Sequence, residues 1–319
     1  MPKFFKKNSR EMSVVVAIVV MFVFFGIADP IYVSTNNVRD IIEQATIYGL
    51  MGIGITGVII TGAIDLSVGS TLALVGVLVA KMAVNGVDPL ICLILGLIFG
   101  LIFGAINGIL VTKVKLQPFI ATMGTMSVYR GLAYVFTNGY PILNIPQSYR
   151  RFIDGQLFPF VRVSVLIFFL FALVMHILLS KTRLGTHIYA IGGNVEATRL
   201  SGVRVEFNQT AIFALGMCGT ALAAMIQVGK LGTGDPTTGN GWELNAIAAT
   251  AIGGTSMAGG RGSIFGTVLG AILFAGLKVG LIVLGVDTFY QFIATGLVII
   301  LAAAIEVMQT NVSSKAKKA

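Results

Sequence analysis

Long uninterrupted blocks of apolar residues are the feature of this sequence that most restricts its fold. A membrane-spanning helix needs roughly 20 mainly apolar residues, and blocks of that size recur along the whole chain. Charged residues make up only 11% of the sequence, against about a quarter in ordinary soluble domains. The blocks therefore predict an all-α polytopic membrane protein with a single transmembrane domain over residues 1–319, and they exclude a soluble globular protein.

About ten membrane spans are predicted, and the third and eighth are short and interrupted by glycine. These two are expected to be half-helices or re-entrant segments. The spans lie near residues 12–28, 44–62, 69–84, 90–111, 118–136, 163–179, 209–229, 244–258, 264–284 and 289–308. Lysines precede the first block, as in a secretory signal peptide, but the block is as long as a span, which favours an uncleaved anchor.

The distribution of basic residues predicts the orientation, because Lys and Arg are retained on the cytoplasmic side of a membrane. With both termini inside, 14 of the 22 Lys and Arg fall in inside segments and 6 in outside segments. The other 2, Arg130 and Lys278, lie near outer span ends, where snorkelling to the interface is expected. Both termini are therefore predicted to be cytoplasmic, and the basic residues indicate orientation rather than nucleic-acid binding.

Glycines at helical spacing form two stripes, which predict close helix packing. Small residues at this spacing let backbones approach where lipid provides no hydrophobic drive for association. The stripes are Gly96, Gly100, Gly104 and Gly108 in the fourth predicted span, and Gly262, Gly266 and Gly270 at the ninth.

Asp65 is the acidic residue that most needs an explanation, because it lies between two apolar runs in the segment TGAIDLSVG (61–69). A carboxylate at or near membrane depth is costly and by default indicates function. Two interpretations remain open. Either Asp65 or Ser67 caps the third predicted span by accepting hydrogen bonds from its free amides, or Asp65 contacts a substrate.

The longest predicted inside loop, residues 180–208, contains the signals of a short capped helix. Asn194 is placed to be the N-cap, Glu196 lies at the positive end of the helix, and Gly202 supplies a C′ stop. A defined amphipathic helix on the cytoplasmic surface is what a docking element requires, whereas a solvated loop needs neither cap nor stop.

Missing motifs argue against several chemistries. The sequence has no G-x-x-x-x-G-K-[ST], so the chain is not expected to bind ATP through a phosphate loop. Two histidines without a Cys/His cluster predict no metal site, and no other cofactor is expected. Cys92 and Cys218 are expected to be small core residues. The nearest carboxylate pair, Asp40 and Glu43, is expected to be solvated in an outside loop, which leaves no constellation for a membrane enzyme.

Six sequence blocks in a fixed order carry a family resemblance. They are TGAIDLSVG at 61–69, PFIATMGT at 118–125, TRLG at 182–185, GGNVEATRLSGV at 192–203, WELNAIAA at 242–249 and GGTSMAGGRG at 253–262. In these blocks the chain resembles the membrane permeases of bacterial ABC importers for monosaccharides, and it looks most like the ribose type. The resemblance covers nearly the whole chain, from about Asn36 to Glu306.

The resemblance implies a multi-pass transport subunit of the bacterial cytoplasmic membrane, without an ATPase site of its own. It further implies a second permease copy in a homo- or heterodimer, cytoplasmic ATPase subunits that use ATP and Mg²⁺, and an extracytoplasmic sugar-binding protein. The loop 180–208 is similar to the coupling helix of ten-span importers of the vitamin B12 kind. The coupling residues that follow are Gly193, Asn194, Glu196, Ala197, Arg199, Leu200 and Gly202.

A sugar would cross by alternating access along a polar path. The candidates are polar residues near breaks and span faces: Asp65, Asn107, Gln117, Thr122, Thr125, Glu243, Asn245 and Thr250. Such residues also serve as helix–helix hydrogen bonds. The chain departs from its relatives at Ala63 and Asn245, where they usually have Gly and Asp, and around Lys278, near which they often have Asn, so the identity of the sugar stays open.

Two other transport mechanisms are alternatives. An ion-coupled secondary sugar transporter favours ionisable relay residues in mid-span, and Asp65 is the sole plausible one. A passive channel requires a ring of charges or a filter-like loop, and neither stands out in the sequence.

Overall fold

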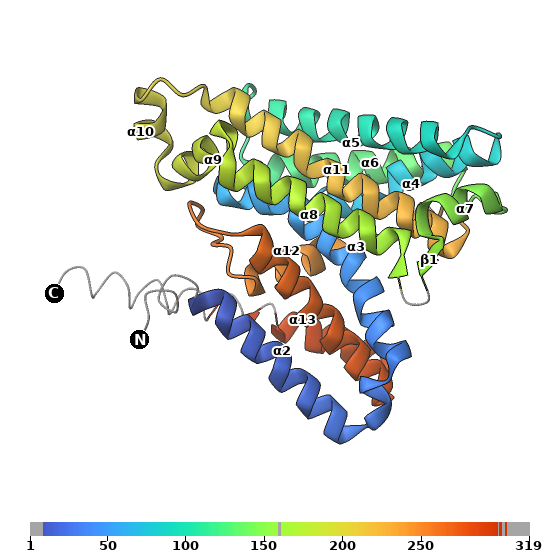
Figure 1. The fold of residues 1–319 in the computed structure, drawn as a ribbon. Coiled ribbons are helices and arrows are strands. Elements are labelled where there is room, and N and C mark those ends of the chain that lie inside the picture. The colour runs from blue at the N-terminus through green and yellow to red at the C-terminus, as the bar shows by residue number, and fades with distance from the viewer. Residues whose placement is uncertain (1–8, 159–160, 299, 302–303, 305–319) are drawn as a thin grey trace.

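A computed structural model describes residues 9–158, 161–298, 300–301 and 304, which form packed helices with one short hairpin (Figure 1). The elements in chain order are α2 (Ser9–Ala28), η1 (Pro30–Val33), α3 (Thr35–Ile60), α4 (Val68–Val84), α5 (Pro89–Thr112), α6 (Pro118–Thr137), α7 (Gln147–Asp154), β1 (Gln156–Phe158), β2 (Val161–Arg162), α8 (Val163–Lys181), α9 (Arg183–Gly193), α10 (Val195–Leu200), α11 (Val205–Leu231), α12 (Trp242–Ile252) and α13 (Ile264–Val283). An unlabelled helix covers Thr288–Val298. The strands β1 and β2 pair antiparallel.

Six helices of the described chain are long and apolar enough to cross a membrane, namely α2, α3, α5, α8, α11 and α13. The helix α4 and the helix Thr288–Val298 are apolar but shorter. The protein is therefore a polytopic helical membrane protein. Each of the ten predicted spans corresponds to a helix in part. The eighth is shorter than expected, because α12 ends at Ile252 and two glycines follow. The last predicted span continues beyond the described residues.

The helix α3 runs between two groups of helices (Figure 1). It packs against α8 and α11 on one side and against α12 and α13 on the other. In its most apolar stretch 89% of the residues are buried, against 17% in α2, which packs on α13 at the edge of the molecule. The helix starts at Thr35, before the predicted residue 44, because Ser34 caps it ahead of its apolar part.

The glycine stripe of α5 lies against α11. A Cβ atom added at Gly100 would lie 2.8 Å from the carbonyl oxygen of Met217, and one at Gly108 would lie 2.7 Å from Cα of Thr210. An added Cβ at Gly104 would overlap the carbonyl oxygen of Phe213. Gly96 continues the stripe against the sulfur of Met225. The two backbones approach so closely because no side chain separates them.

The second glycine stripe faces α12 rather than lipid. Added Cβ atoms at Gly266 and Gly270 would overlap the carbonyl oxygens of Gly253 and Ala249, respectively. Gly262 precedes α13 and lies against the side chain of Thr255. The stripe thus lets α13 pack directly on the backbone of α12.

Glu43 is not solvated, contrary to the sequence-based expectation, although Asp40 is exposed. The side chain of Glu43 is 8% exposed and forms ion pairs with Arg39, Arg162 and Lys230 at 2.9, 2.7 and 3.1 Å. These partners come from α3, β2 and α11, which no local sequence pattern brings together. These ion pairs connect α3, β2 and α11, and the three cations offset the free-energy cost of burying the Glu43 carboxylate.

Arg130 and Lys278 do not snorkel, which corrects a second expectation. The Arg130 guanidinium donates to the carbonyl oxygens of Pro236 and Thr238 and, at 3.3 Å, to that of Gly69. It thereby fastens the loop before α12 to α4 and α6. The Lys278 amine donates to the hydroxyl of Tyr48 at 2.8 Å. Both cations therefore point to partners within the protein.

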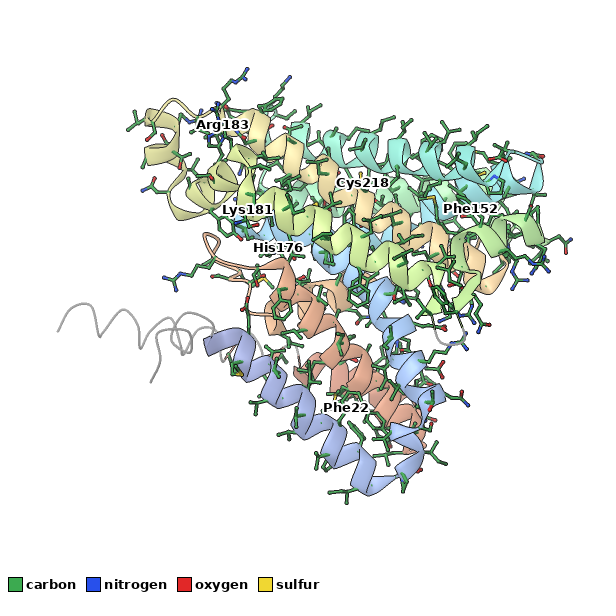
Figure 2. The ribbon with its side chains drawn as sticks, in the orientation of Figure 1. Phe22, Phe152, His176, Lys181, Arg183 and Cys218 are labelled. Carbon is green, nitrogen blue, oxygen red and sulfur yellow. The ribbon has the colours of Figure 1, made fainter. Side chains whose placement is uncertain are left out.

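Cys92 is a fully buried core residue, as the sequence predicted, whereas Cys218 is only partly buried. Figure 2 labels Cys218 on α11, the helix that packs along α5.

Candidate functional site

A buried polar cluster occupies the break between α3 and α4. Asp65 is 2% exposed, and its Oδ1 atom accepts hydrogen bonds from the amide and hydroxyl of Ser67 at 2.9 and 2.7 Å. The side-chain amide of Asn107 donates to Oδ2 of Asp65 at 3.0 Å and to the Ser67 hydroxyl at 2.7 Å. Tyr129 donates to the side-chain oxygen of Asn107 at 3.4 Å. We call Asp65, Ser67, Asn107 and Tyr129 the polar cluster.

The contacts of Asp65 show how the carboxylate is used in this conformation. Ser67 is the N-cap residue of α4, and its own side chain makes no capping hydrogen bond. Asp65 binds the amide of Ser67 itself, so it fixes the turn that precedes α4 rather than the first turn of the helix. Three donors compensate the carboxylate for its lost water. Both oxygens contact protein groups, and neither is open to a substrate.

The start of α6 holds the break from a second side. The hydroxyl of Thr122 accepts from the amide of Leu66 at 3.2 Å and donates within its helix to Pro118 at 2.8 Å. Thr125 lies one turn further on, buried, and donates to the carbonyl of Thr122. Thr122 and Thr125 thus face the break beside the polar cluster that holds Asp65 and Asn107. Gln117 does not, because its side chain is exposed and caps nothing.

The remaining candidates lie on α12, apart from the polar cluster. The hydroxyl of Thr250 is buried and donates to the carbonyl of Gly52 at 3.2 Å, which joins α12 to α3. The Glu243 carboxylate lies beside the bare backbone of Gly69, near the guanidinium of Arg130. Asn245 lines a groove with Trp242 and Lys278.

The candidate path included neither Ser67 nor Tyr129, although Ser67 was named beside Asp65 as a possible cap. Ser67 was visible in the same short segment as Asp65. Tyr129 had a weaker signal, because Thr122, Thr125 and Tyr129 recur at the spacing of one helix face. The burial of all three residues shows that this face of α6 points inward.

The loop 180–208 contains the predicted short helix as α10, six residues long. The side chain of Asn194 accepts from the amide of Ala197 at 2.9 Å, and Gly202 follows the helix with φ of +81°. That φ is in the left-handed region that glycine tolerates best. Leu200 is 88% exposed, while Thr198 is buried. The helix therefore projects an apolar side chain from a defined scaffold.

The other side chains of α10 are mostly exposed as well. Glu196 and Ala197 are exposed. Arg199 forms an ion pair with Glu206 of α11 at 2.7 Å, with both partners largely in solvent, so this pair adds little stability. Figure 2 shows Lys181 and Arg183 at this end of the molecule, far from Phe152 on α7 at the other end.

The helix α9, which the sequence analysis did not predict, joins α10 to the core. Gly192 lies so close to α3 that an added Cβ would overlap the carbonyl of Ile60 and the amide of Gly260. That amide donates to Ile60 at 2.8 Å, and Tyr189 donates to Gly262 at 2.8 Å. Burial raises the pKa of the Tyr189 phenol, which keeps it a donor. Gly193, by contrast, faces open space.

These contacts place the α9–α10 unit directly on the segment that ends in Asp65. Ile60 is the last residue of α3, and the break with the polar cluster follows it. The turn at Gly259 and Gly260, where φ is +86° and +73°, contacts Gly192 from the other side. Gly192 of α9 thus contacts backbone next to both breaks, at 61–67 and at 253–263.

Comparisons with known proteins identify the family. The family described as "Branched-chain amino acid transport system / permease component" matches residues 37–303. The chain belongs to this family of permease components. The permease is 42% identical to the ribose import permease protein of Bacillus subtilis (strain 168) over 93% of its own length and 92% of that relative's.

Two further relatives extend the likeness. The ribose import permease protein of Escherichia coli (strain K12) is 38% identical, with 95% of each chain covered. The D-allose transport system permease protein of Escherichia coli (strain K12) is 36% identical, with 90% of this chain and 88% of the relative covered. No solved structure matches the chain. The permease is thus a transport subunit and not an enzyme, in accord with the resemblance seen in the six sequence blocks.

Proposed function

We propose that the permease is the membrane-spanning subunit of an ATP-driven bacterial importer for ribose or a related pentose or hexose. The observation that carries the proposal is similarity over nearly the full chain length to ribose import permeases, at 42 and 38% identity. Relatives named for allose and for galactose match as well. The cargo class is therefore a monosaccharide.

The proposed topology has ten spans in the cytoplasmic membrane and both termini in the cytoplasm. In this arrangement α4, α6, α12 and the helix Thr288–Val298 complete the set begun by the six long apolar helices. The surfaces of α2, α5 and α8 carry many exposed large apolar side chains and face lipid or another copy of the chain. The basic end near α9 lies in the cytoplasm, in keeping with the positive-inside rule.

The proposed partners follow from the ends of the molecule. Cytoplasmic ATPase subunits dock on α10 and supply ATP and Mg²⁺ chemistry, an extracytoplasmic binding protein delivers the sugar, and a second permease copy completes the pathway. Support for the docking site comes from the capped α10, the exposed Leu200 and the rigid contact of Gly192 with the end of α3.

Alternating access requires that the polar cluster change its contacts. Asp65, Asn107 and Thr122 hold α4, α5 and α6 together around the break, so a path along them opens only when these helices separate. The movement of α10 supplies the displacement, through Gly192 and the break. The binding protein provides selectivity, and the path needs only weak polar contacts.

The ion-coupled alternative depends on Asp65 as a relay. A relay carboxylate must exchange protons or ions with a water-filled path. Asp65 is 2% exposed and already accepts three hydrogen bonds, which favours a structural role in this conformation. We therefore expect uptake to depend on ATP hydrolysis and to persist when the ion gradients are collapsed.

Uptake by the assembled system tests the proposal. The permease, its ATPase and its binding protein are placed in proteoliposomes, and labelled ribose, allose, galactose and other sugars are supplied with and without internal ATP. Saturable uptake of at least one sugar that requires ATP supports the function. Uptake driven by an ion gradient alone, or no uptake of any monosaccharide, contradicts it.

The variant Ala197→Trp tests the coupling role of α10 in the same assay. Its bulk lies on an exposed surface, so the helices fold, but ATPase docking and uptake are lost. The matched control is Val84→Trp, at a residue that is 44% exposed at the end of α4. Equal uptake by the two variants would remove α10 from the mechanism.

A further inference from the structure

A groove with a volume of about 260 Å³ opens between α12, α13 and the helix Thr288–Val298. Its volume is slightly below the roughly 300–1,000 Å³ of pockets for drug-sized ligands, so it suits a ligand of one sugar ring. Polar, aromatic and aliphatic side chains line its wall. Those that matter here are Trp242, Asn245, Phe274, Lys278 and Gln291.

Several polar groups in the groove have donors or acceptors that no other described residue uses. Among the described residues, none forms a hydrogen bond or ion pair with the side-chain amide of Asn245. Gln291 uses its amide nitrogen to donate to the carbonyl of Val286 at 2.9 Å, which leaves its own oxygen as an acceptor. Lys278 donates to Tyr48, and no described carboxylate pairs with its amine. Each of these groups sits in the wall of one groove.

Aromatic packing holds the wall in place. Tyr48 is 5% exposed and lies edge-on between Trp242 and Phe274, with ring centroids 5.5 and 5.7 Å apart. The Lys278 amine lies 5.3 Å from the centroid of the Tyr48 ring, beside the hydroxyl edge, and is held by its hydrogen bond to that hydroxyl. Trp242 remains partly exposed at the groove.

The geometry points to this groove as a binding site for a neutral monosaccharide on the transport path. A sugar ring carries hydroxyls that both donate and accept, which matches a free amide, an amide oxygen and an amine. Its C–H faces match the aromatic and aliphatic remainder of the wall, and concave sites of this mixed kind are typical of small-molecule binding. This inference rests on the proposed function, because it takes the cargo class from it.

The site would lie towards the extracytoplasmic side in the proposed topology. The helix α12 runs from Trp242 at the groove to Ile252, beyond which the turn at Gly260 contacts Gly192 of the cytoplasmic α9. Sugar delivered from outside would therefore meet the groove before it reaches the level of the two breaks. One end of α12 contacts the cargo and the other lies next to the coupling unit.

Trp242 is the only tryptophan in the chain, so its fluorescence reports directly on the groove. The purified full-length permease in detergent is titrated with ribose, allose and galactose, and with sucrose as a control too large for the groove. We expect a saturable change in emission with at least one monosaccharide and none with sucrose.

Two variants and a matched control locate the binding site. Asn245→Ala removes one neutral hydrogen-bonding group and should weaken apparent affinity about 3- to 10-fold, and Lys278→Met should weaken it about tenfold or more. The control, Asn85→Ala, removes an exposed amide at the end of α4, outside the groove, and should titrate as the wild type. Gel filtration and thermal stability verify that each variant is folded.

Uptake measured in parallel separates this inference from the proposed function. If the assembled system imports a sugar that leaves Trp242 emission unchanged, the groove is not the site and the function stands. If emission responds and the two groove variants weaken the response, the site is supported whether or not that sugar is imported. If Asn245→Ala and Lys278→Met titrate as Asn85→Ala does, the groove is refuted.

Discussion

Replacing Gly104 by alanine is the most direct test of how this molecule is packed. Gly104 lies at the middle of the α5 stripe, where an added Cβ would overlap the carbonyl oxygen of Phe213. It would also lie 2.7 Å from Cα of Ala214 and 2.9 Å from Cγ of Met217. Two of these three atoms belong to backbone, which no rotamer change can move away. The helices α5 and α11 must therefore separate.

The size of the effect follows from how far the helices must move. Carbon contacts are comfortable at about 3.5–4.0 Å, so α5 and α11 must part by roughly 1 Å. A gap of 0.5–1 Å already forfeits a quarter to a half of the dispersion energy of neighbouring contacts. Such overpacking typically costs about 1–3 kcal/mol. The higher helix propensity of alanine offsets about 0.5–1 kcal/mol of that.

Gly124 supplies the matched control, because it lies in α6 with nothing within 4 Å of an added Cβ. Gly124→Ala should leave stability unchanged or raise it slightly. Thermal unfolding of both purified variants in detergent measures the difference, and Gly104→Leu should go further and abolish folded, membrane-inserted protein. If Gly104→Ala is as stable as Gly124→Ala, the stripe does not set the α5–α11 distance and the packing argument is wrong.

Further predictions concern orientation, energy source and the polar cluster. Reporter fusions after Val205 should be cytoplasmic and fusions after Asp154 external, and an external signal at Val205 would break the ten-span topology. The purified permease should not hydrolyse ATP until its ATPase partner is added, so robust activity of the permease alone would contradict the transport-subunit assignment. Asn107→Leu should lower the free energy of unfolding by about 1–3 kcal/mol, since it leaves the buried Asp65 carboxylate with an unpaired oxygen. A free energy of unfolding equal to that of the wild type would show that Asp65 finds another donor.

The sequence predicted best the features that are local. Asn194 and Gly202 predict the two ends of α10, because capping depends on residues within one turn of each other. The α5 stripe was visible for the same reason, since its glycines recur along one helix. The helix α9 was missed, because its three glycines and the short run RLGTHIYAIGG do not look like a stable helix, and tertiary contacts at Gly192 and Tyr189 hold it in place.

Features built from distant segments could not be foreseen. Glu43 looked like a solvated loop residue, because Arg162 and Lys230 are far away in the sequence. Arg130 was expected to snorkel, because the loop before α12, whose carbonyl oxygens it binds, is distant from it in the sequence. Of the candidate path, Asp65, Asn107, Thr122 and Thr125 come together, but the sequence does not reveal that Asn107 is the donor to Asp65. Pairings of this kind depend on which helices touch.

The enclosure of α3 has a consequence for how the protein is made. Its most apolar stretch has a mean hydropathy of 1.3, against 2.7 in α5 and α8, because protein rather than lipid surrounds it. It leaves the ribosome before α11 and α13, the helices that bury it, have been synthesised. Partition into lipid alone is weakly favoured for such a segment. We therefore expect stable insertion of α3 to depend on the later helices more than that of α5 or α8 does.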